Sequence, residues 1–319
     1  MLSELSKGKP GKGEIQEHSV SRDPIYENNL FGTLFQKLEV GMPLADVDGT
    51  MINYRYDGPV NGEVIMLSNS LAADLSMWKY QIPLLTEAGY RVLRYDNRGH
   101  GQSAAPPGPY SIEMLSLDAL KLMDFLGLEK VHFCGLSLGG MVGQMLGACY
   151  GARLNSLILC DTASYTPFPK MWDERIEIVR KNGMAVLVDA TIDRWFTKSG
   201  QERLQEDVEE IRRTIVNTSV EGYCGGCSAI RNLDLRKTIR RISTPTLVVV
   251  GEQDQGTPVS AAEFIKEQIA LSRLKVIPDA AHFVNIEQSI IFNSTILSFL
   301  RNQIIGWNGI ISKEKTVIG

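Results

Sequence analysis

The sequence predicts an α/β protein with a mainly parallel central sheet and a helical cap inserted after the sixth strand. Strand-like and helix-like segments alternate from about residue 43, which is typical of parallel strands joined by helices. The alternation lapses between residues 164 and 236, where charged helical segments predominate. It resumes with the apolar run Thr246–Gly251. The helical segment is therefore interpreted as an insertion between two parts of one sheet.

The expected strands are short apolar runs bounded by turn residues. A leading hairpin is predicted at Leu44–Val47 and Met51–Tyr56, because Asp48-Gly49 between them is a hairpin turn signal. The remaining predicted strands have the length and apolar character of buried parallel strands. In chain order they are Val64–Ser68, Arg91–Tyr95, Lys130–Cys134, Ser156–Cys160, Thr246–Gly251 and Arg273–Ile277.

Helices are expected between these strands, where apolar residues recur at helical spacing. Trp78–Ala88 is the first, and Gly89 supplies its stop signal. A second helix opens at Ser111 and is predicted to turn these apolar side chains inward: Met114, Leu117, Leu120 and Leu126. The other predicted helices of the core are Ser137–Tyr150, Val259–Ile269 and the closing helix Ile286–Ile304.

These elements define the expected domain organisation. Residues 42–163 and 237–305 form the α/β core, and residues 164–236 form the cap. Residues 1–41 are a partly flexible leader, because their first half is rich in Lys, Gly, Glu and Ser and lacks the apolar segment of a secretory signal. Residues 306–319 form a C-terminal tail.

Composition argues against several classes of function. The formal net charge of the 319 residues is −4, and no basic patch predicts binding to nucleic acid or to an anionic membrane surface. No stretch approaches the roughly 20 apolar residues that span a bilayer. Neither a second Cys pair nor a nearby His completes a zinc site around Cys224-Gly-Gly-Cys227. We therefore expect a cytoplasmic protein with reduced cysteines and no metal.

A nucleophile motif lies in the middle of the chain. Gly135-Leu136-Ser137-Leu138-Gly139 matches G-x-S-x-G, follows the apolar strand Val131–Cys134 and leads into a helix. Glycines on both sides allow a sharp turn close to neighbouring backbone. The helix N-terminus behind Ser137 directs amide groups at developing negative charge. Ser137 is therefore predicted to be the nucleophile of an α/β-hydrolase.

A serine hydroxyl needs a base to remove its proton, and the chain has four histidines. His18 lies in the leader, His100 in a Gly-rich turn and His132 in the strand before the motif. His282 lies in the loop after the last strand, has small neighbours and follows the serine in chain order. His282 is therefore the predicted base.

The third member of a catalytic triad is a carboxylate that orients the imidazole. Asp254 lies just past the strand Thr246–Val250 and about 28 residues before His282, so it is the predicted acid. Asp161, at the end of the strand before the cap, is the alternative, and Glu252 is the residual candidate.

The oxyanion of the intermediate needs two backbone donors. The amide of Leu138 directly follows the nucleophile and is predicted to be one of them. The second is expected from the loop after the strand Val64–Ser68 and is assigned to the amide of Leu71. Each donor of this kind typically lowers the barrier by about 3–4 kcal/mol.

Several segments match one known family. In the core they are Ser68–Leu71, Tyr95–Gly101, Pro106–Tyr110, His132–Gln144, Ala280–His282 and Asn285–Gln288. In the cap they are Arg194–Thr197, Glu221–Cys224 and Ala229–Leu235. Over about residues 42–303 the chain resembles the 3-oxoadipate enol-lactonases of the α/β-hydrolase superfamily. The leader and the tail from about Gly306 depart from that pattern.

The resemblance implies that the protein opens a small lactone that carries a carboxylate, either 3-oxoadipate enol-lactone or a related compound. Ser137 would attack the ring carbonyl, and water activated by His282 would release the acyl-enzyme. No metal or organic cofactor is required. The alternatives are an esterase or lactonase for another small molecule, a non-hydrolytic enzyme, and a receptor-like binding protein. The sequence leaves a homodimer open.

A substrate carboxylate needs a cation in the pocket. The candidates are Arg194 and Arg231 in the cap and Arg98 in the loop after the strand Arg91–Tyr95, with an ordinary ion pair as the alternative for each. Trp78 and Trp195 are candidates for the pocket wall, with core packing as the alternative.

Deletion of residues 1–21 is expected to change kcat/KM by less than about threefold, because this segment has little apolar surface to bury. Steady-state kinetics of the full and shortened chains on one activated ester measures the effect. A larger loss, or a different mass in solution, would identify the leader as a structural arm.

Overall fold

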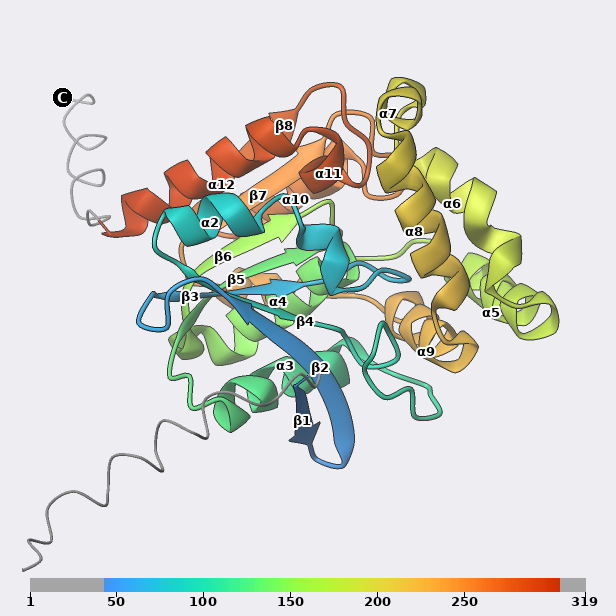
Figure 1. Ribbon diagram of the computed structural model, residues 1–319, viewed down its shortest axis with the longest axis horizontal. Helices are drawn as coiled ribbons and strands as arrows, with labels where there is room; N and C mark the ends of the chain where they lie inside the picture. Colours follow the sequence, from blue (N-terminus) through green and yellow to red (C-terminus); the bar gives the residue numbers. More distant parts are fainter. Residues whose placement is uncertain (1–42, 305–319) are drawn as a thin grey trace, which may run out of the picture. The chain divides into compact units, whose positions relative to one another are not determined.

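The computed structural model describes residues 43–304, so the predicted leader 1–41 and tail 306–319 lie outside the described residues. Within this range the strands form one sheet in the order β1-β2-β4-β3-β5-β6-β7-β8 (Figure 1). Their bounds are β1 Leu44–Val47, β2 Thr50–Asp57, β3 Val64–Ser68, β4 Arg91–Tyr95, β5 Val131–Leu136, β6 Leu154–Cys160, β7 Thr246–Gly251 and β8 Ser272–Ile277. β2 pairs antiparallel with β1 and β4, and the other pairs are parallel.

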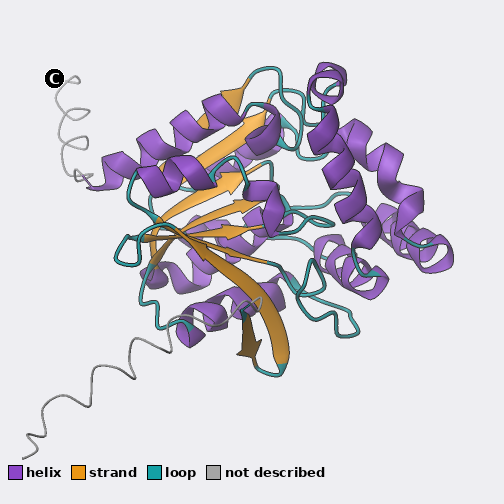
Figure 2. Ribbon diagram, in the orientation of Figure 1, coloured by secondary structure: helices purple, strands orange, loops and turns teal. Residues whose placement is uncertain are grey.

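Helices cover both faces of this sheet (Figure 2). On one side lie α2 (Ile82–Glu87) and α12 (Ser289–Ile304), and on the other lie α3 (Ile112–Phe125) and α4 (Leu138–Tyr150). Helix α10 (Val259–Gln268) connects β7 to β8, and α11 (Val284–Glu287) precedes α12. Because both faces are covered, β3, β5 and β7 are buried along their whole length, as their apolar sequences predict.

A run of helices from α5 to α9 lies between β6 and β7 at the carboxyl end of the strands in Figure 1, and the short turn η4 after it leads into the amino end of β7. The bounds of these elements are α5 Pro169–Asn182, η3 Met184–Leu187, α6 Val188–Trp195, α7 Lys198–Arg203, α8 Gln205–Asn217 and α9 Val220–Arg231, followed by η4 Thr238–Arg241. The predicted fold class, including helices inserted after the sixth strand, is therefore confirmed. The limits of the cap at residues 164 and 236 stay a prediction.

Two predicted helices are divided. Instead of one helix over Trp78–Ala88, a 3-10 turn η1 (Leu75–Trp78) precedes the short helix α2. Pro83 lacks a backbone N–H and fits only the first turn of a helix, so α2 begins beside it. The closing helix is likewise two helices, because Gln288 between α11 and α12 has a non-helical backbone conformation (φ −125°, ψ 49°).

The inward face of α3 also differs from the prediction. Leu117 is 38 % exposed, so its predicted inward position is wrong. The buried apolar face consists of Ile112, Leu115, Ala119, Leu122 and Met123. These positions follow the i, i+3, i+7, i+10, i+11 spacing of one helical stripe. The other three predicted residues, Met114, Leu120 and Leu126, are partly buried and pack against the core. The prediction thus placed the stripe to one side of its centre, because spacing alone does not say which residues of an apolar helix are most deeply buried.

Candidate active site

Ser137 lies at a strained turn between β5 and α4. Its φ of 56° and ψ of −111° place a non-glycine residue in a region that side chains rarely adopt. A Cβ on Gly135 would lie 2.1 Å from the carbonyl oxygen of Gly139, and a Cβ on Gly139 would lie 2.2 Å from that of Ser68. Both glycines of the motif are thus required by close approach of backbone. The Ser137 amide donates to the carbonyl of Cys160 over 2.9 Å.

His282 is held by Asp254. The His282 Nδ1 atom lies 2.8 Å from Asp254 Oδ2, and that oxygen also accepts from Thr257 Oγ1 at 2.6 Å. Asp254 Oδ1 accepts from the amides of Gly256 at 2.8 Å and Thr257 at 3.0 Å. Because an ionised carboxylate only accepts hydrogen bonds, it favours the tautomer with the proton on Nδ1, which leaves Nε2 free to act as a base.

The electrostatics of Asp254 agree with this geometry. Burial by itself would raise the pKa of this carboxyl, but the charge of His282 and the hydrogen bonds from His282 and Thr257 outweigh burial and lower the pKa. Asp254 therefore stays ionised at neutral pH. Its charge is then available to stabilise an imidazolium when His282 takes up a proton.

The alternative acids occupy different environments. Asp161 Oδ1 accepts from the Gly251 amide at 2.8 Å, and Asp161 Oδ2 is buried without a partner. Burial and the nearby charge of Asp254 raise the pKa of Asp161 well above its usual range. The Glu252 side chain is exposed. The structure thus brings Asp254, rather than Asp161 or Glu252, into hydrogen-bonding contact with His282.

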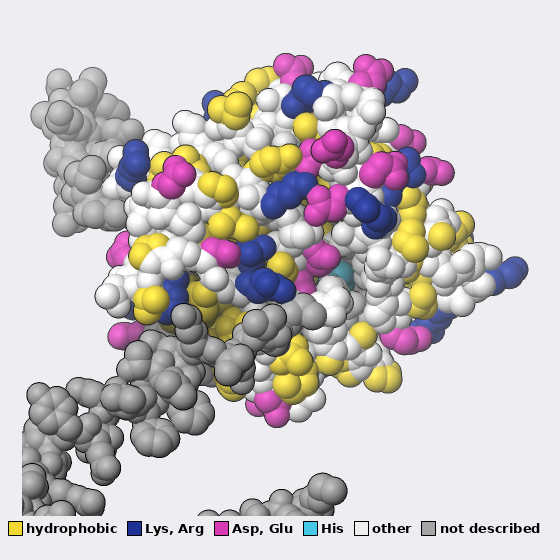
Figure 3. All heavy atoms as spheres, in the orientation of Figure 1, with side chains coloured by type: hydrophobic (Ala, Val, Ile, Leu, Met, Phe, Trp, Pro, Cys, Tyr) yellow, Lys and Arg dark blue, Asp and Glu magenta, His cyan; other side chains and the backbone are white. Residues whose placement is uncertain are grey.

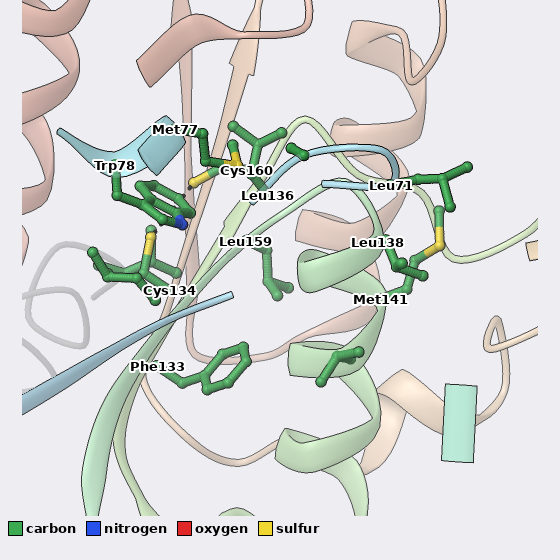
Figure 4. Packing of buried hydrophobic residues seen from close by; sticks show 14 of the residues in the cluster. Leu71, Met77, Trp78, Phe133, Cys134, Leu136, Leu138, Met141, Leu159 and Cys160 are labelled. Atoms are coloured by element: carbon green, nitrogen blue, oxygen red, sulfur yellow. Dashed lines mark hydrogen bonds between the residues drawn. The ribbon is translucent and has the colours of Figure 1, made fainter. Parts of the chain in front are cut away.

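Ser137 and His282 line one pocket with a volume of about 740 Å³. Leu71 lines the same pocket, and Figure 4 shows its side chain together with those of Leu138 and Met141 at the N-terminal end of α4. Leu138 is the first residue of α4, so its amide has no acceptor within the helix. The two residues whose amides are the predicted oxyanion donors therefore lie beside Ser137: Leu138 directly follows it, and Leu71 lines the same pocket.

The wall of the pocket opposite the sheet is formed by cap helices. Helix α5 contributes Met171, Trp172 and Arg175, with Arg175 one helical turn after the other two, and α6 contributes Thr191 and Arg194. Further lining residues are mostly apolar or aromatic: Phe168, Leu187, Trp195, Ile215, Tyr223, Ile230, Leu233 and Phe264. Among the described residues, none that lines this pocket is an aspartate or a glutamate.

Two of the predicted substrate-binding residues, Arg194 and Trp195, line this pocket. Arg98 does not line it, because its guanidinium makes two hydrogen bonds to the Asp118 carboxylate, at 2.7 and 2.6 Å. Arg231 is also a correction, because it pairs with Asp173 at 2.5 Å outside the pocket. Both arginines thus have the ordinary ion-pair role.

Trp78 is the third correction. Its side chain is fully buried, and its Nε1 donates to Asn69 Oδ1 at 3.0 Å. Figure 4 shows the indole on the side of Met77 and Cys134, away from Leu71 and Leu138. An apolar indole with one satisfied donor is stable in the core, so Trp78 supports the loop after β3 and does not form the pocket wall.

Glu287 is a buried carboxylate that sequence reasoning did not single out. Its Oε2 accepts from the Ala281 amide at 2.8 Å. Its Oε1 accepts from the amide of Thr197 at 2.9 Å and from the Thr197 hydroxyl. Glu287 therefore joins the loop of His282 to the start of α7. The only sequence signal was a charge within an apolar segment, which by itself does not indicate a partner.

A second set of contacts joins the His282 loop to the cap, through Phe283 and Trp195. The Phe283 amide donates to the Trp195 carbonyl at 3.0 Å, and the rings of Trp195 and Phe283 stack with centroids 4.1 Å apart. The Trp195 ring also stacks over His282, with centroids 6.3 Å apart. The loop that carries His282 is thus packed directly against the end of α6.

The described part of the chain offers no group of His, Cys, Asp and Glu that could hold a metal ion. None of the helices within residues 43–304 has the length and apolar character needed to cross a membrane. Lys, Arg, Asp and Glu side chains are interspersed over the visible face in Figure 3. That face carries no single-sign patch.

Comparisons with known proteins agree on one family. Residues 63–289 match the alpha/beta hydrolase fold family. A curated relative, 3-oxoadipate enol-lactonase 2 of Acinetobacter baylyi, is 36 % identical over 78 % of this chain and 93 % of its own length. The crystal structure of an enol-lactonase from Burkholderia xenovorans is 42 % identical, with a TM-score of 0.79 over 81 % of this chain and 100 % of that one. A putative carbamate hydrolase of Variovorax paradoxus is 28 % identical over 78 % of this chain and 96 % of its own length.

Replacement of Glu287 by Gln tests the connection between the cap helices and the His282 loop. An amide nitrogen cannot accept the N–H of Ala281 or Thr197, so one of the two bridges is lost in either orientation. We expect kcat to fall between about tenfold and a hundredfold, because small displacements of a catalytic group have effects of this size. Steady-state kinetics and a melting curve measure the two consequences separately.

The matched control is Glu252→Gln, which changes an exposed glutamate in the loop after β7. We expect its kcat and melting temperature to stay close to those of the wild type. A Glu287→Gln protein with a lowered melting temperature but an unchanged kcat would mean that Glu287 stabilises the fold without positioning His282.

Proposed function

We propose that this chain, which belongs to the alpha/beta hydrolase fold family, is a serine hydrolase that opens a small lactone. Its similarity to 3-oxoadipate enol-lactonases supports this proposal. The observation that carries the proposal is the His282–Asp254 hydrogen bond of 2.8 Å at a pocket that the strained Ser137 also lines. Ser137, His282 and Asp254 are the proposed nucleophile, base and acid.

In the first half-reaction, Ser137 Oγ attacks the ring carbonyl and His282 Nε2 takes the hydroxyl proton. Asp254 stabilises the imidazolium, and the amides of Leu71 and Leu138 hold the oxyanion. The C–O bond of the ring then breaks, and the ring oxygen, which stays attached to the acyl group, receives the proton from His282. If the substrate is an enol-lactone, this oxygen leaves as an enol, which is a better leaving group than an alkoxide.

In the second half-reaction, water replaces the serine. His282 Nε2 removes a proton from water as the oxygen attacks the acyl carbonyl, and the same donors hold the second oxyanion. Ser137 Oγ leaves with the proton from His282, and a free carboxylic acid is released. Proton transfer and oxyanion stabilisation suffice for this chemistry, so no step calls for a metal or an organic cofactor.

The proposed substrate is 3-oxoadipate enol-lactone or a related lactone with a free carboxylate. The support is the identity of 36 % and 42 % to enol-lactonases over nearly their whole length, cap region included. A second candidate is an ester or lactone with a larger acyl part. A volume of about 740 Å³ is in the range of pockets that bury drug-sized ligands, so a small lactone would fill only part of it.

Ser137→Ala, His282→Ala and Asp254→Asn are each expected to lower kcat by about 10³-fold or more, because the three groups act as a unit. The measurement is turnover of 3-oxoadipate enol-lactone and of 4-nitrophenyl acetate, with circular dichroism to establish that each variant is folded. A pre-steady-state burst of 4-nitrophenol in the wild type is the expected sign of an acyl-enzyme. Near-normal turnover by Ser137→Ala would refute the assignment of the nucleophile.

The matched control for the acid is Asp161→Asn. Asp161 accepts from the Gly251 amide and makes no hydrogen bond to His282, and burial raises the pKa of its carboxyl well above the ordinary value, so a neutral amide is a mild replacement there. We therefore expect a much smaller loss of kcat than in Asp254→Asn. The opposite order, with both variants folded, would place the catalytic acid at Asp161. Binding of lactones without turnover would favour a receptor-like protein instead.

A further inference from the structure

Two arginines line the pocket from successive cap helices, and neither has an acidic partner in the part of the chain that the structure describes. Arg175 is on α5 and Arg194 is on α6. Within residues 43–304, neither guanidinium has a carboxylate within 4 Å, although ion pairs are frequent elsewhere in this range. Arg236, which also lines the pocket, is already paired with Asp234 at 2.8 Å. Arg175 and Arg194 are thus the lining cations whose charge is not neutralised by a described carboxylate.

Each guanidinium is held by a neutral group. The Arg175 guanidinium carbon lies 4.8 Å from the centroid of the Trp172 ring, and Trp172 Nε1 donates to Thr166 Oγ1 at 3.1 Å, which orients the indole. Arg194 Nη2 donates to Thr191 Oγ1 at 3.1 Å. Because a guanidinium has five N–H donors, these contacts fix its position and leave most donors for a ligand.

The positive charges of Arg175 and Arg194 also repel each other. Burial first, and then the charge of Arg175, lower the pKa of Arg194 from its ordinary value. Two partly buried like charges beside each other are unfavourable unless an anion lies between or against them. Their surroundings, which include Trp172 and Tyr223, are apolar enough to strengthen any charge–charge interaction.

We propose that Arg175 and Arg194 form a carboxylate-binding subsite in the cap wall of the pocket. The ligand class is lactones and esters whose acyl part ends in a free carboxylate, held by planar guanidinium groups that match its geometry. The rest of the pocket that holds this subsite and Ser137 is lined mostly by apolar and aromatic side chains, which favour a substrate with a short carbon chain. The inference rests on the proposed function, because it assigns the far end of a substrate whose carbonyl reacts at Ser137.

The test compares two activated esters that differ only in charge: the mono-4-nitrophenyl ester of adipic acid, and the same compound with its free acid methylated. Wild-type protein is expected to favour the charged ester by at least about tenfold in kcat/KM. Arg175→Met keeps the apolar stem and removes the charge. It should lower kcat/KM for the charged ester by about ten- to a hundredfold and leave that for the neutral ester within about threefold.

The matched control is Arg231→Met, which removes a cap arginine that is paired with Asp173 outside the pocket. Both esters should react with this variant as with the wild type. Equal kcat/KM for the two esters in the wild type would overturn the subsite, and so would an equal loss on both esters in an Arg175→Met protein whose circular dichroism spectrum and melting temperature match those of the wild type.

The two proposals fail in different experiments. Wild-type protein that prefers the charged ester but does not open 3-oxoadipate enol-lactone would keep the subsite and refute the lactonase proposal. Wild-type protein that opens the lactone but does not distinguish the two esters would keep the lactonase proposal and refute the subsite.

Discussion

The close contact between the nucleophile turn and the loop after β3 is the constraint on which the site depends. The Gly139 amide donates to the Asn69 carbonyl at 3.1 Å, and no side chain at Gly139 could fit against Ser68. Asn69 is in turn fixed by Trp78 Nε1 at 3.0 Å and by the backbone of Tyr95 at 2.9 Å. One backbone contact therefore sets the spacing between Ser137 and the amides proposed to hold the oxyanion, and buried polar groups with satisfied partners keep it rigid.

The base is positioned by a different part of the molecule. His282 belongs to a loop that Glu287 ties to Thr197 and that Trp195 covers with its ring. Arg194 precedes Trp195 at the end of α6. The proposed carboxylate subsite and the packing on the His282 loop thus share one helical turn. A ligand bound to Arg194 would therefore contact the same helical turn whose next residue packs on His282, which places binding at the far end of a substrate close to the group that sets the geometry of the reaction.

Sequence patterns predicted those features that depend on local spacing. Apolar runs predicted the strands because parallel strands covered on both faces have no polar side, and the motif around Ser137 fixed its place between β5 and α4. The partners of charged side chains were not predictable in this way. Arg98 and Asp118 are twenty positions apart, and Arg231 and Asp173 are fifty-eight apart, yet they meet in the fold. Only the tertiary structure shows which of the pocket-lining arginines have no carboxylate within 4 Å among residues 43–304.

The charge of the pocket is opposite to that of the chain. The formal net charge is −4, which argues against a polyanionic partner, because long-range attraction follows the summed field. A pocket walled by apolar side chains responds to its own charges, since the low local dielectric strengthens them relative to distant, solvent-screened groups. With Arg236 neutralised by Asp234, the local excess comes from Arg175 and Arg194. A chain whose net charge disfavours large anions can therefore still select a small one, provided that the ligand fits within the pocket and spans the distance from the arginines to Ser137.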